Sequence, residues 1–132
     1  MITLTQDQAA RLGIAGLGHR RETKYHNQHV MVDGYRFDSK VEAERYGELV
    51  MLQQAGHIKD LRVHPRFCIV DKDVNGAAMA YEADFEYVTL PDMARIVEDV
   101  KSEATARIPL FRLKWRLVQA RYPEYTFRVE ER

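Results

Sequence analysis

At 132 residues, the chain is long enough to bury one hydrophobic core and too short for two. Its composition, 45% hydrophobic and 30% charged, is that of an ordinary globular domain and excludes a disordered or fibrous chain. A net charge of zero, taken as a sum, argues against a nucleic-acid partner.

The charges are, however, distributed unevenly along the chain. Residues 1–41 carry six Lys or Arg and four Asp or Glu, residues 42–100 carry six and twelve, and residues 101–121 carry six and one. An acidic middle beside a basic flank suits a metal-using enzyme that acts on a polyanion, because carboxylates hold cations while Lys and Arg bind phosphates. A solvated basic helix face is the simpler explanation of the same pattern.

Membrane and secretion signals are absent from the sequence. No apolar run approaches the roughly 20 residues that span a bilayer, and the first residues lack the layout of a signal peptide. The single cysteine, Cys68, cannot form an internal disulfide and lies in an apolar stretch typical of a core. We therefore expect a cytoplasmic protein without a membrane partner.

The N-terminal part of the chain predicts helix, irregular segment and hairpin in that order. A helix is expected over 5–12, followed by a polar irregular segment over 16–27. Asp33 and Gly34 suit the positive φ angles of a two-residue turn, so a hairpin is expected over 29–37.

A long helix is expected next, over 40–54. Ser39 precedes Glu42 by three residues, which is the spacing of a capping box at a helix start. Gly56 is placed to end the helix, because glycine readily adopts the left-handed conformation that follows a last turn.

The remainder predicts a mixed α/β domain. A turn at Asn75-Gly76 separates the second and third of five expected strands, which cover 58–63, 66–70, 79–90, 94–101 and 126–130. Pro109 starts a helix over 109–122, and the apolar side chains expected to face the sheet are Leu110, Leu113, Leu117 and Val118. We predict an α/β fold with helices flanking one central mixed sheet and the core order helix, strand, strand, strand, helix, strand.

Carboxylates and a lysine on two of these strands suggest a metal site. Side chains alternate along a strand, so Asp99 and Lys101 share one face while Glu98 and Val100 occupy the other. Asp84 lies on the preceding strand, and consecutive strands usually pair, so the two aspartates should approach each other. Two carboxylates with water suit Mg²⁺. An ion pair between Asp99 and Lys101 on an exposed strand is the simpler alternative.

Glu42 is a third candidate ligand. At about 100° per residue, Glu42 falls in the middle of the apolar arc of its helix beside Leu49, whereas Glu44 and Glu48 fall on the polar side. A carboxylate on a buried face is costly unless it is paired or bound to a metal. The capping box with Ser39 is the competing explanation, and the two roles are compatible.

The order of these residues resembles that of the PD-(D/E)XK nuclease superfamily. A closer resemblance is to a family of short phage and prophage proteins described as a domain of unknown function, and it covers about residues 24–127. The matching segments are KYHN (24–27), DGYRFDSKVEAERYGEL (33–49), AGHI (55–58), YEADF (81–85), VEDVKS (97–102), Thr105 and FRLKWRL (111–117). Ser102 departs from this pattern, where Gly is usual, and so does His64, where Gln is usual.

The resemblance implies a restriction-endonuclease-like core and a nuclease site. Glu42, Asp84 and Asp99 would be metal ligands, joined by the backbone carbonyl of Val100. Lys101 would position or activate the water. The cofactor would be Mg²⁺, with Mn²⁺ as a substitute, and no small-molecule cofactor is expected. On this basis residues 24–132 form the nuclease domain, preceded by an N-terminal helix and irregular basic segment over residues 1–23.

The segments also look like phage junction-resolving endonucleases and the cutting subunit of some heteromeric transposases. That likeness implies a phage-encoded endonuclease that cuts branched DNA, Holliday junctions included, during recombination or replication in a bacterial host. Two cuts need two active sites, hence a homodimer. The expected phosphate-binding residues are Arg20, Arg21, Lys24, Arg107, Arg112, Lys114 and Arg116. The alternatives are a catalytically idle DNA-binding accessory protein and a nicking enzyme or exonuclease.

Overall fold

The computed structural model of the chain describes residues 29–73 and 75–132. The chain divides into two compact units, residues 1–51 and 52–132. The expected helix over 5–12 and irregular segment over 16–27 lie outside the described residues. No helix in the described part is long and apolar enough to cross a membrane.

The first unit contains the predicted hairpin. Strand β1 (Val30–Val32) pairs antiparallel with β2 (Tyr35–Phe37). Asp33 and Gly34 form the turn with φ angles of 52° and 81°. Both angles lie in the left-handed region that a two-residue hairpin turn requires, so the prediction from the Asp-Gly pair is confirmed.

Helix α2 spans Lys40–Gln54, as predicted. The backbone N–H of Glu42 donates to the Ser39 hydroxyl at 3.2 Å, which is the first half of a capping box. The Glu42 carboxylate accepts from the backbone N–H of Asp38 at 3.3 Å, one residue before the N–H that a regular capping box uses. Gly56, with φ of 83°, follows the last turn.

Tyr46 joins α2 to the hairpin within the first unit. Its hydroxyl donates to the Asp33 carboxylate at 2.8 Å, and its ring lies 5.2 Å from that of Phe37. Burial raises the pKa of Tyr46 to about 12, and the Asp33 carboxylate adds to the increase. The same aspartate therefore makes the turn and anchors the helix.

The buried face of α2 is shifted slightly from the predicted arc. Val41 is exposed, whereas Arg45 is buried and pairs with Glu48 at 3.0 Å. An arginine enters the buried face because its guanidinium is neutralised by a carboxylate one turn away and its stem is apolar. The buried residues of the helix are Ala43, Arg45, Tyr46, Gly47 and Leu49.

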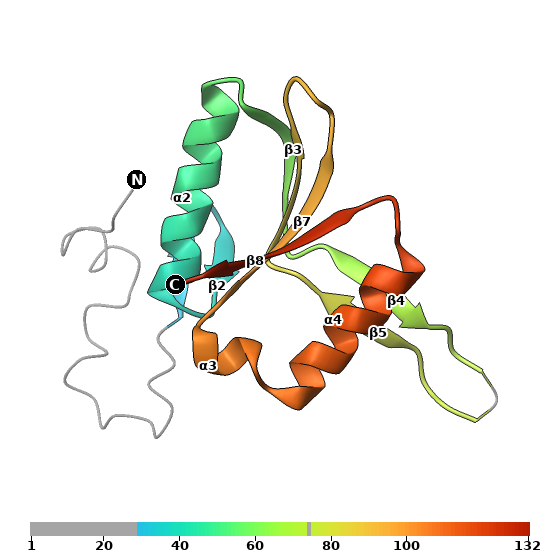
Figure 1. Ribbon diagram of the computed structural model, residues 1–132. Coiled ribbons are helices and arrows are strands. Elements are labelled where there is room, and N and C mark those ends of the chain that lie inside the picture. Colours follow the sequence, from blue (N-terminus) through green and yellow to red (C-terminus); the bar gives the residue numbers. More distant parts are fainter. Residues whose placement is uncertain (1–28, 74) are drawn as a thin grey trace, which may run out of the picture. The chain divides into compact units, whose positions relative to one another are not determined.

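The second unit is built on a mixed four-stranded sheet of order β3-β6-β7-β8 (Figure 1). The strands are β3 (Ile58–Val63), β6 (Phe85–Thr89), β7 (Arg95–Lys101) and β8 (Thr126–Glu131). β7 and β8 are parallel, and the other two neighbouring pairs are antiparallel. The predicted mixed α/β class is confirmed. The predicted order helix, strand, strand, strand, helix, strand corresponds along the chain to α2, β3, β6, β7, helix α4 (Pro109–Arg121) and β8.

The prediction of a single strand over residues 79–90 is wrong. This segment consists of β5 (Met79–Glu82) and β6, interrupted at residues 83–84, and β5 belongs to a separate two-stranded sheet with β4 (Arg66–Val70). The alternation of buried and exposed residues continues across the interruption, so periodicity alone gave no sign of it.

Two helices connect β7 to β8. The short helix α3 (Glu103–Ala106), which was not predicted, begins after Ser102, whose hydroxyl accepts from the Thr105 backbone N–H. Helix α4 (Pro109–Arg121) begins at Pro109, as predicted. A core cluster of the second unit contains Phe67, Ile69, Tyr81, Ala83, Val97 and Val118, and the partly buried residues packed against it are Phe111, Trp115, Tyr122, Tyr125 and Phe127.

The predicted inward face of α4 is wrong except for Val118. Leu110, Leu113 and Leu117 are 61%, 55% and 39% exposed. Phe111 and Trp115 pack against the core instead. The helix carries two apolar stripes, and the aromatic one faces the sheet because aromatic side chains bury more apolar area than leucines.

This difference predicts which residues of α4 stabilise the fold. Trp115→Ala should lower the free energy of unfolding by about 3 kcal/mol, because a large ring leaves the packed cluster. Leu113→Ala, on the exposed stripe, should change it by less than about 0.5 kcal/mol. Urea unfolding followed by circular dichroism measures both. Equal losses for the two variants would contradict the assigned helix face.

Candidate functional site

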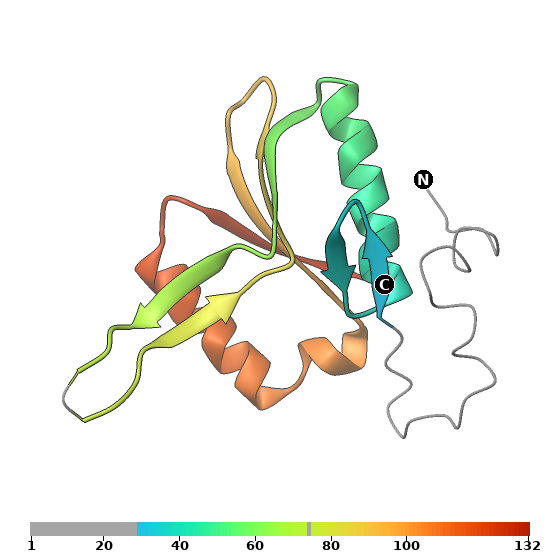
Figure 2. The same ribbon diagram turned by 180° about the vertical axis from the view of Figure 1, so that it is seen from behind.

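A long hairpin of the second unit bends at one point in both of its strands. β3 passes into β4 at His64 and Pro65, and β5 passes into β6 at Ala83 and Asp84 (Figure 2). The register of β3 with β6 continues unchanged into that of β4 with β5. Across the bend, the His64 N–H donates to the Asp84 carbonyl at 2.9 Å and the Ala83 N–H donates to the Pro65 carbonyl at 3.0 Å. The bend therefore keeps His64 opposite Asp84.

Asp84 links this bend to β7. Its backbone N–H donates to the Glu98 carbonyl at 3.2 Å, and its Oδ2 atom accepts from the Val100 N–H at 2.7 Å. Phe85 is paired with Glu98 in the β6–β7 ladder, so the same register places Asp84 opposite Asp99. The expected pairing of these two consecutive strands is confirmed.

The register therefore gives one row of opposite residues at the bend: His64 directly after β3, Asp84 directly before β6, and Asp99 within β7. Residues directly opposite in neighbouring strands share a face, with Cβ atoms about 4.5–5.5 Å apart. A ligand nitrogen of His64 and a carboxylate oxygen of Asp84 lie within 4.8 Å of each other. Lys101 follows two positions after Asp99, on the same face of β7.

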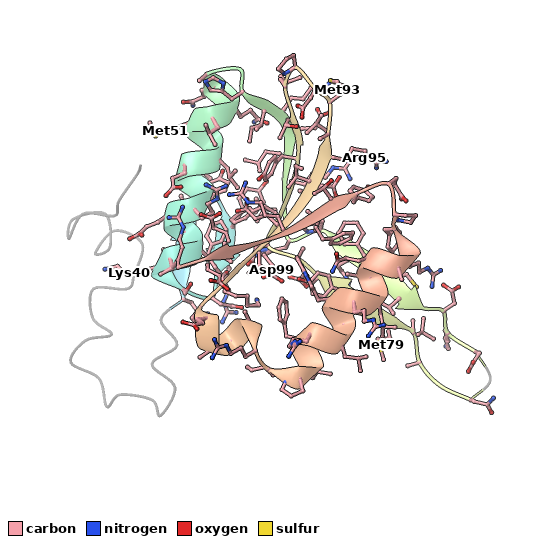
Figure 3. All side chains as sticks on the ribbon, viewed as in Figure 1. Lys40, Met51, Met79, Met93, Arg95 and Asp99 are labelled. Atoms are coloured by element: carbon pink, nitrogen blue, oxygen red, sulfur yellow. The ribbon has the colours of Figure 1, made fainter. Side chains whose placement is uncertain are left out.

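Asp99, which is labelled in Figure 3, is the buried member of this row. It is 2% exposed, the Tyr81 hydroxyl donates to its Oδ2 atom, and the Lys101 ammonium donates to its Oδ1 atom at 2.7 Å. Burial raises the pKa of Asp99, while the charge of Lys101 and the Val100 N–H act in the opposite direction. A carboxylate oxygen accepts more than one partner, so these bonds are compatible with an added cation.

Lys101 is held between a carboxylate and an aromatic ring. Its side chain is 21% exposed, and its Nζ atom lies 5.2 Å from the centre of the Phe111 ring on α4. The ammonium is thus attracted by Asp99 and by the ring face together. The ion pair of the simpler alternative is present, but the exposed strand is wrong, because residues 96–100 are all buried.

Glu98 was placed on the other face of β7 from Asp99, and its pairing with Phe85 agrees. Its side chain is fully buried and accepts from the Tyr87 hydroxyl at 2.7 Å. Glu98 lies between Ile96 and Val100 on that face, and this apolar setting is the signal in the sequence that its carboxyl group is buried.

Glu42 belongs to the first unit. It is partly buried, and its helix position lies among buried residues, as the arc predicted. Glu44 is partly buried as well, so exposure alone does not separate the two glutamates as the arc suggested. The capping interaction is present, and the role of Glu42 as a metal ligand stays a prediction.

His64 is the residue of the row that sequence reasoning missed. The sequence singled it out only as a departure from the family pattern, where Gln is usual. Hairpin register read from the sequence does not find it, because a turn at Asn75-Gly76 would place residue 64 opposite residue 87. In the structure, Asp73 is bridged to Gly76 and the register shifts between Cys68 and Val70, which brings residue 64 opposite residue 84.

The predicted phosphate-binding residues differ in their surroundings. Arg112 and Arg116 are exposed on α4, and Lys114 between them is partly buried. Arg107 is exposed and pairs with Glu103 at 2.6 Å. The remaining predicted contacts, which lie outside the described residues, are Arg20, Arg21 and Lys24.

The buried carboxyl group of Asp99 predicts a pH-dependent stability difference. Because its folded-state pKa lies above the ordinary value, its contribution to stability is present in acid and lost as pH rises through the folded-state pKa. Asp99→Asn, which cannot ionise, should therefore gain unfolding free energy relative to wild type at pH 7, and the gain should vanish near pH 3.

Urea unfolding at several pH values tests this, with Asp92→Asn as the control, since Asp92 is exposed. A pH-independent difference between wild type and Asp99→Asn would show that the effect arises from packing and not from ionisation.

Comparison with known proteins gives a family. The family described as "Protein of unknown function (DUF1064)" matches residues 22–130, and the chain belongs to this family. No curated protein and no solved structure matches the chain.

Proposed function

We propose that the protein is a divalent-metal-dependent DNA endonuclease of the PD-(D/E)XK superfamily, with a restriction-endonuclease-like core. The observation that supports this most is the cross-strand position of Asp84 and Asp99 with Lys101 on the same face. Two carboxylates and a lysine around one small volume are the groups that metal-assisted phosphodiester hydrolysis needs.

The donor set fits a divalent cation. The carboxylates of Asp84 and Asp99 would hold it, together with the Val100 carbonyl and Glu42. A bound Mg²⁺ or Mn²⁺ would supply Lewis-acid polarisation of the scissile phosphate and of water. Lys101, oriented by Asp99 and the Phe111 ring, would donate a hydrogen bond to the attacking water and hold it in line.

The proposed substrate is branched DNA, including Holliday junctions. This part of the proposal depends on the resemblance to phage junction-resolving enzymes. It implies a homodimer with two active sites, acting in the cytoplasm of a bacterial host during phage recombination or replication.

Removal of the site residues should abolish cleavage and spare binding. Asp84→Asn and Lys101→Ala should each lower the single-turnover cleavage rate by roughly 100-fold or more, because each removes a group that acts on the reacting atoms. Affinity for DNA should change little, because neither residue contacts the backbone away from the scissile phosphate. The assay uses four-way, flap, linear and single-stranded DNA with Mg²⁺ or Mn²⁺.

Matched controls come from the same elements. Glu86 lies on β6, two residues after Asp84 in the sequence. Glu86→Gln should leave cleavage unchanged. Glu42→Gln should act like Asp84→Asn, whereas Glu44→Gln should not. Wild-type protein that binds DNA without cutting any of the four substrates would instead indicate a binding accessory protein, and cutting of linear or single-stranded DNA alone would indicate another kind of nuclease.

We expect Arg112 and Arg116 to bind the phosphates of the DNA backbone. Both are exposed and lie one turn apart on α4. Replacing both with Ala should weaken binding to every DNA shape and reduce the slope of log affinity against log salt by roughly 1.4–1.8, for two lost contacts. The measurement is a salt series with the Lys101→Ala variant as the background. Arg36→Ala with Lys72→Ala removes the same charge elsewhere and should leave the slope unchanged, and equal slopes in both double variants would exclude α4 from the DNA path.

A further inference from the structure

His64 lies where a further metal ligand would lie. It is directly opposite Asp84 in the bent hairpin, and its backbone N–H donates to the Asp84 carbonyl at 2.9 Å. Its φ angle of 56° is in the left-handed region, so the chain departs from regular strand geometry at this residue. The side chain is partly buried, and one of its ligand nitrogens lies within 4.8 Å of a carboxylate oxygen of Asp84.

The distance between the two side chains is close to that of two ligands of one ion. Ligand atoms each about 2.1 Å from a shared cation are roughly 3–4.3 Å apart, depending on the angle at the metal. A nitrogen of His64 and an oxygen of Asp84 lie within 4.8 Å of each other, which is near this range. Asp84 Oδ2 is already fixed by the Val100 N–H, which limits how far that carboxylate turns.

We propose that His64 is a direct ligand of the divalent cation at Asp84, through an imidazole nitrogen. This rests on the metal site of the proposed function. Mg²⁺ prefers a shell of oxygen atoms, whereas Mn²⁺ and later first-row metals bind imidazole readily. His64 therefore makes the site select Mn²⁺ over Mg²⁺.

Metal binding to the full-length wild-type protein without DNA tests this apart from catalysis. Electron spin echo spectroscopy of bound Mn²⁺ should show coupling to a ligand ¹⁴N nucleus, and His64→Asn should remove it. Mn²⁺ affinity measured by calorimetry should fall by roughly tenfold or more in the variant, as for the loss of groups that support a metal site. Mg²⁺ affinity should fall much less, because the replacement offers an amide oxygen.

The variants separate ligation from folding. Asn tolerates the left-handed backbone, so His64→Asn preserves the bend, and His64→Gln provides a second replacement. His57→Gln is the control, because His57 is exposed elsewhere in the second unit and its loss should leave the ¹⁴N coupling in place. Persistence of the ¹⁴N coupling in His64→Asn, or equal losses of Mn²⁺ and Mg²⁺ affinity, would overturn the proposal.

The metal-binding and cleavage results together distinguish failure of the His64 proposal from failure of the proposed function. Mn²⁺ binding lost in Asp84→Asn but unchanged in His64→Asn rejects only the ligand role of His64. Mn²⁺ bound through nitrogen by a wild-type protein that cuts no DNA supports the ligand and rejects the nuclease. Mn²⁺ binding unaffected by both substitutions rejects the metal site itself and the His64 proposal with it.

Discussion

Asp84 divides its backbone hydrogen bonds between two neighbouring strands. Its carbonyl accepts from His64 on one side, while its N–H donates to Glu98 on the other. In a regular antiparallel pair, one residue makes both bonds to the same partner. Asp84 departs from this pattern at the bend. Its backbone N–H still has an acceptor, because the Glu98 carbonyl on β7 takes the place of the His64 carbonyl. The bond from the Val100 N–H to the Asp84 carboxylate then fixes the side chain, so the row of candidate ligands depends on this one residue.

The same region concentrates buried carboxyl groups. Glu98 and Asp99 are adjacent on opposite faces of β7, both are almost inaccessible to solvent, and each accepts from a tyrosine hydroxyl. Removing a carboxylate from water is unfavourable unless hydrogen bonds and counter-charges compensate. The Lys101 ammonium compensates only in part, since the pKa of Asp99 is still raised. A binding site for a cation would complete the compensation, which connects the electrostatics of β7 with the proposed metal.

The large aromatic side chains of helix α4 face the core, whereas its smaller leucine side chains face solvent. Its aromatic residues pack on the core, and Phe111 also supports Lys101 through its ring face. The leucines are left outside, between arginines. The helix thereby positions the lysine of the candidate site on one face and presents basic residues on the other.

The sequence by itself determined the local elements and most of the candidate site. Turn residues, capping spacing and strand alternation are local signals, so the Asp33-Gly34 turn, the bounds of α2, the start of α4 and the pairing of β6 with β7 were predictable. Only the tertiary structure decided which stripe of α4 is buried and where the strand over 79–90 breaks. The buried stripe of α4 and the strand break both depend on which neighbouring element offers the better packing or hydrogen bonds. A local sequence pattern does not indicate which element that neighbour is. His64 entered the row for the same reason, because its place opposite Asp84 follows from pairing between segments about twenty residues apart.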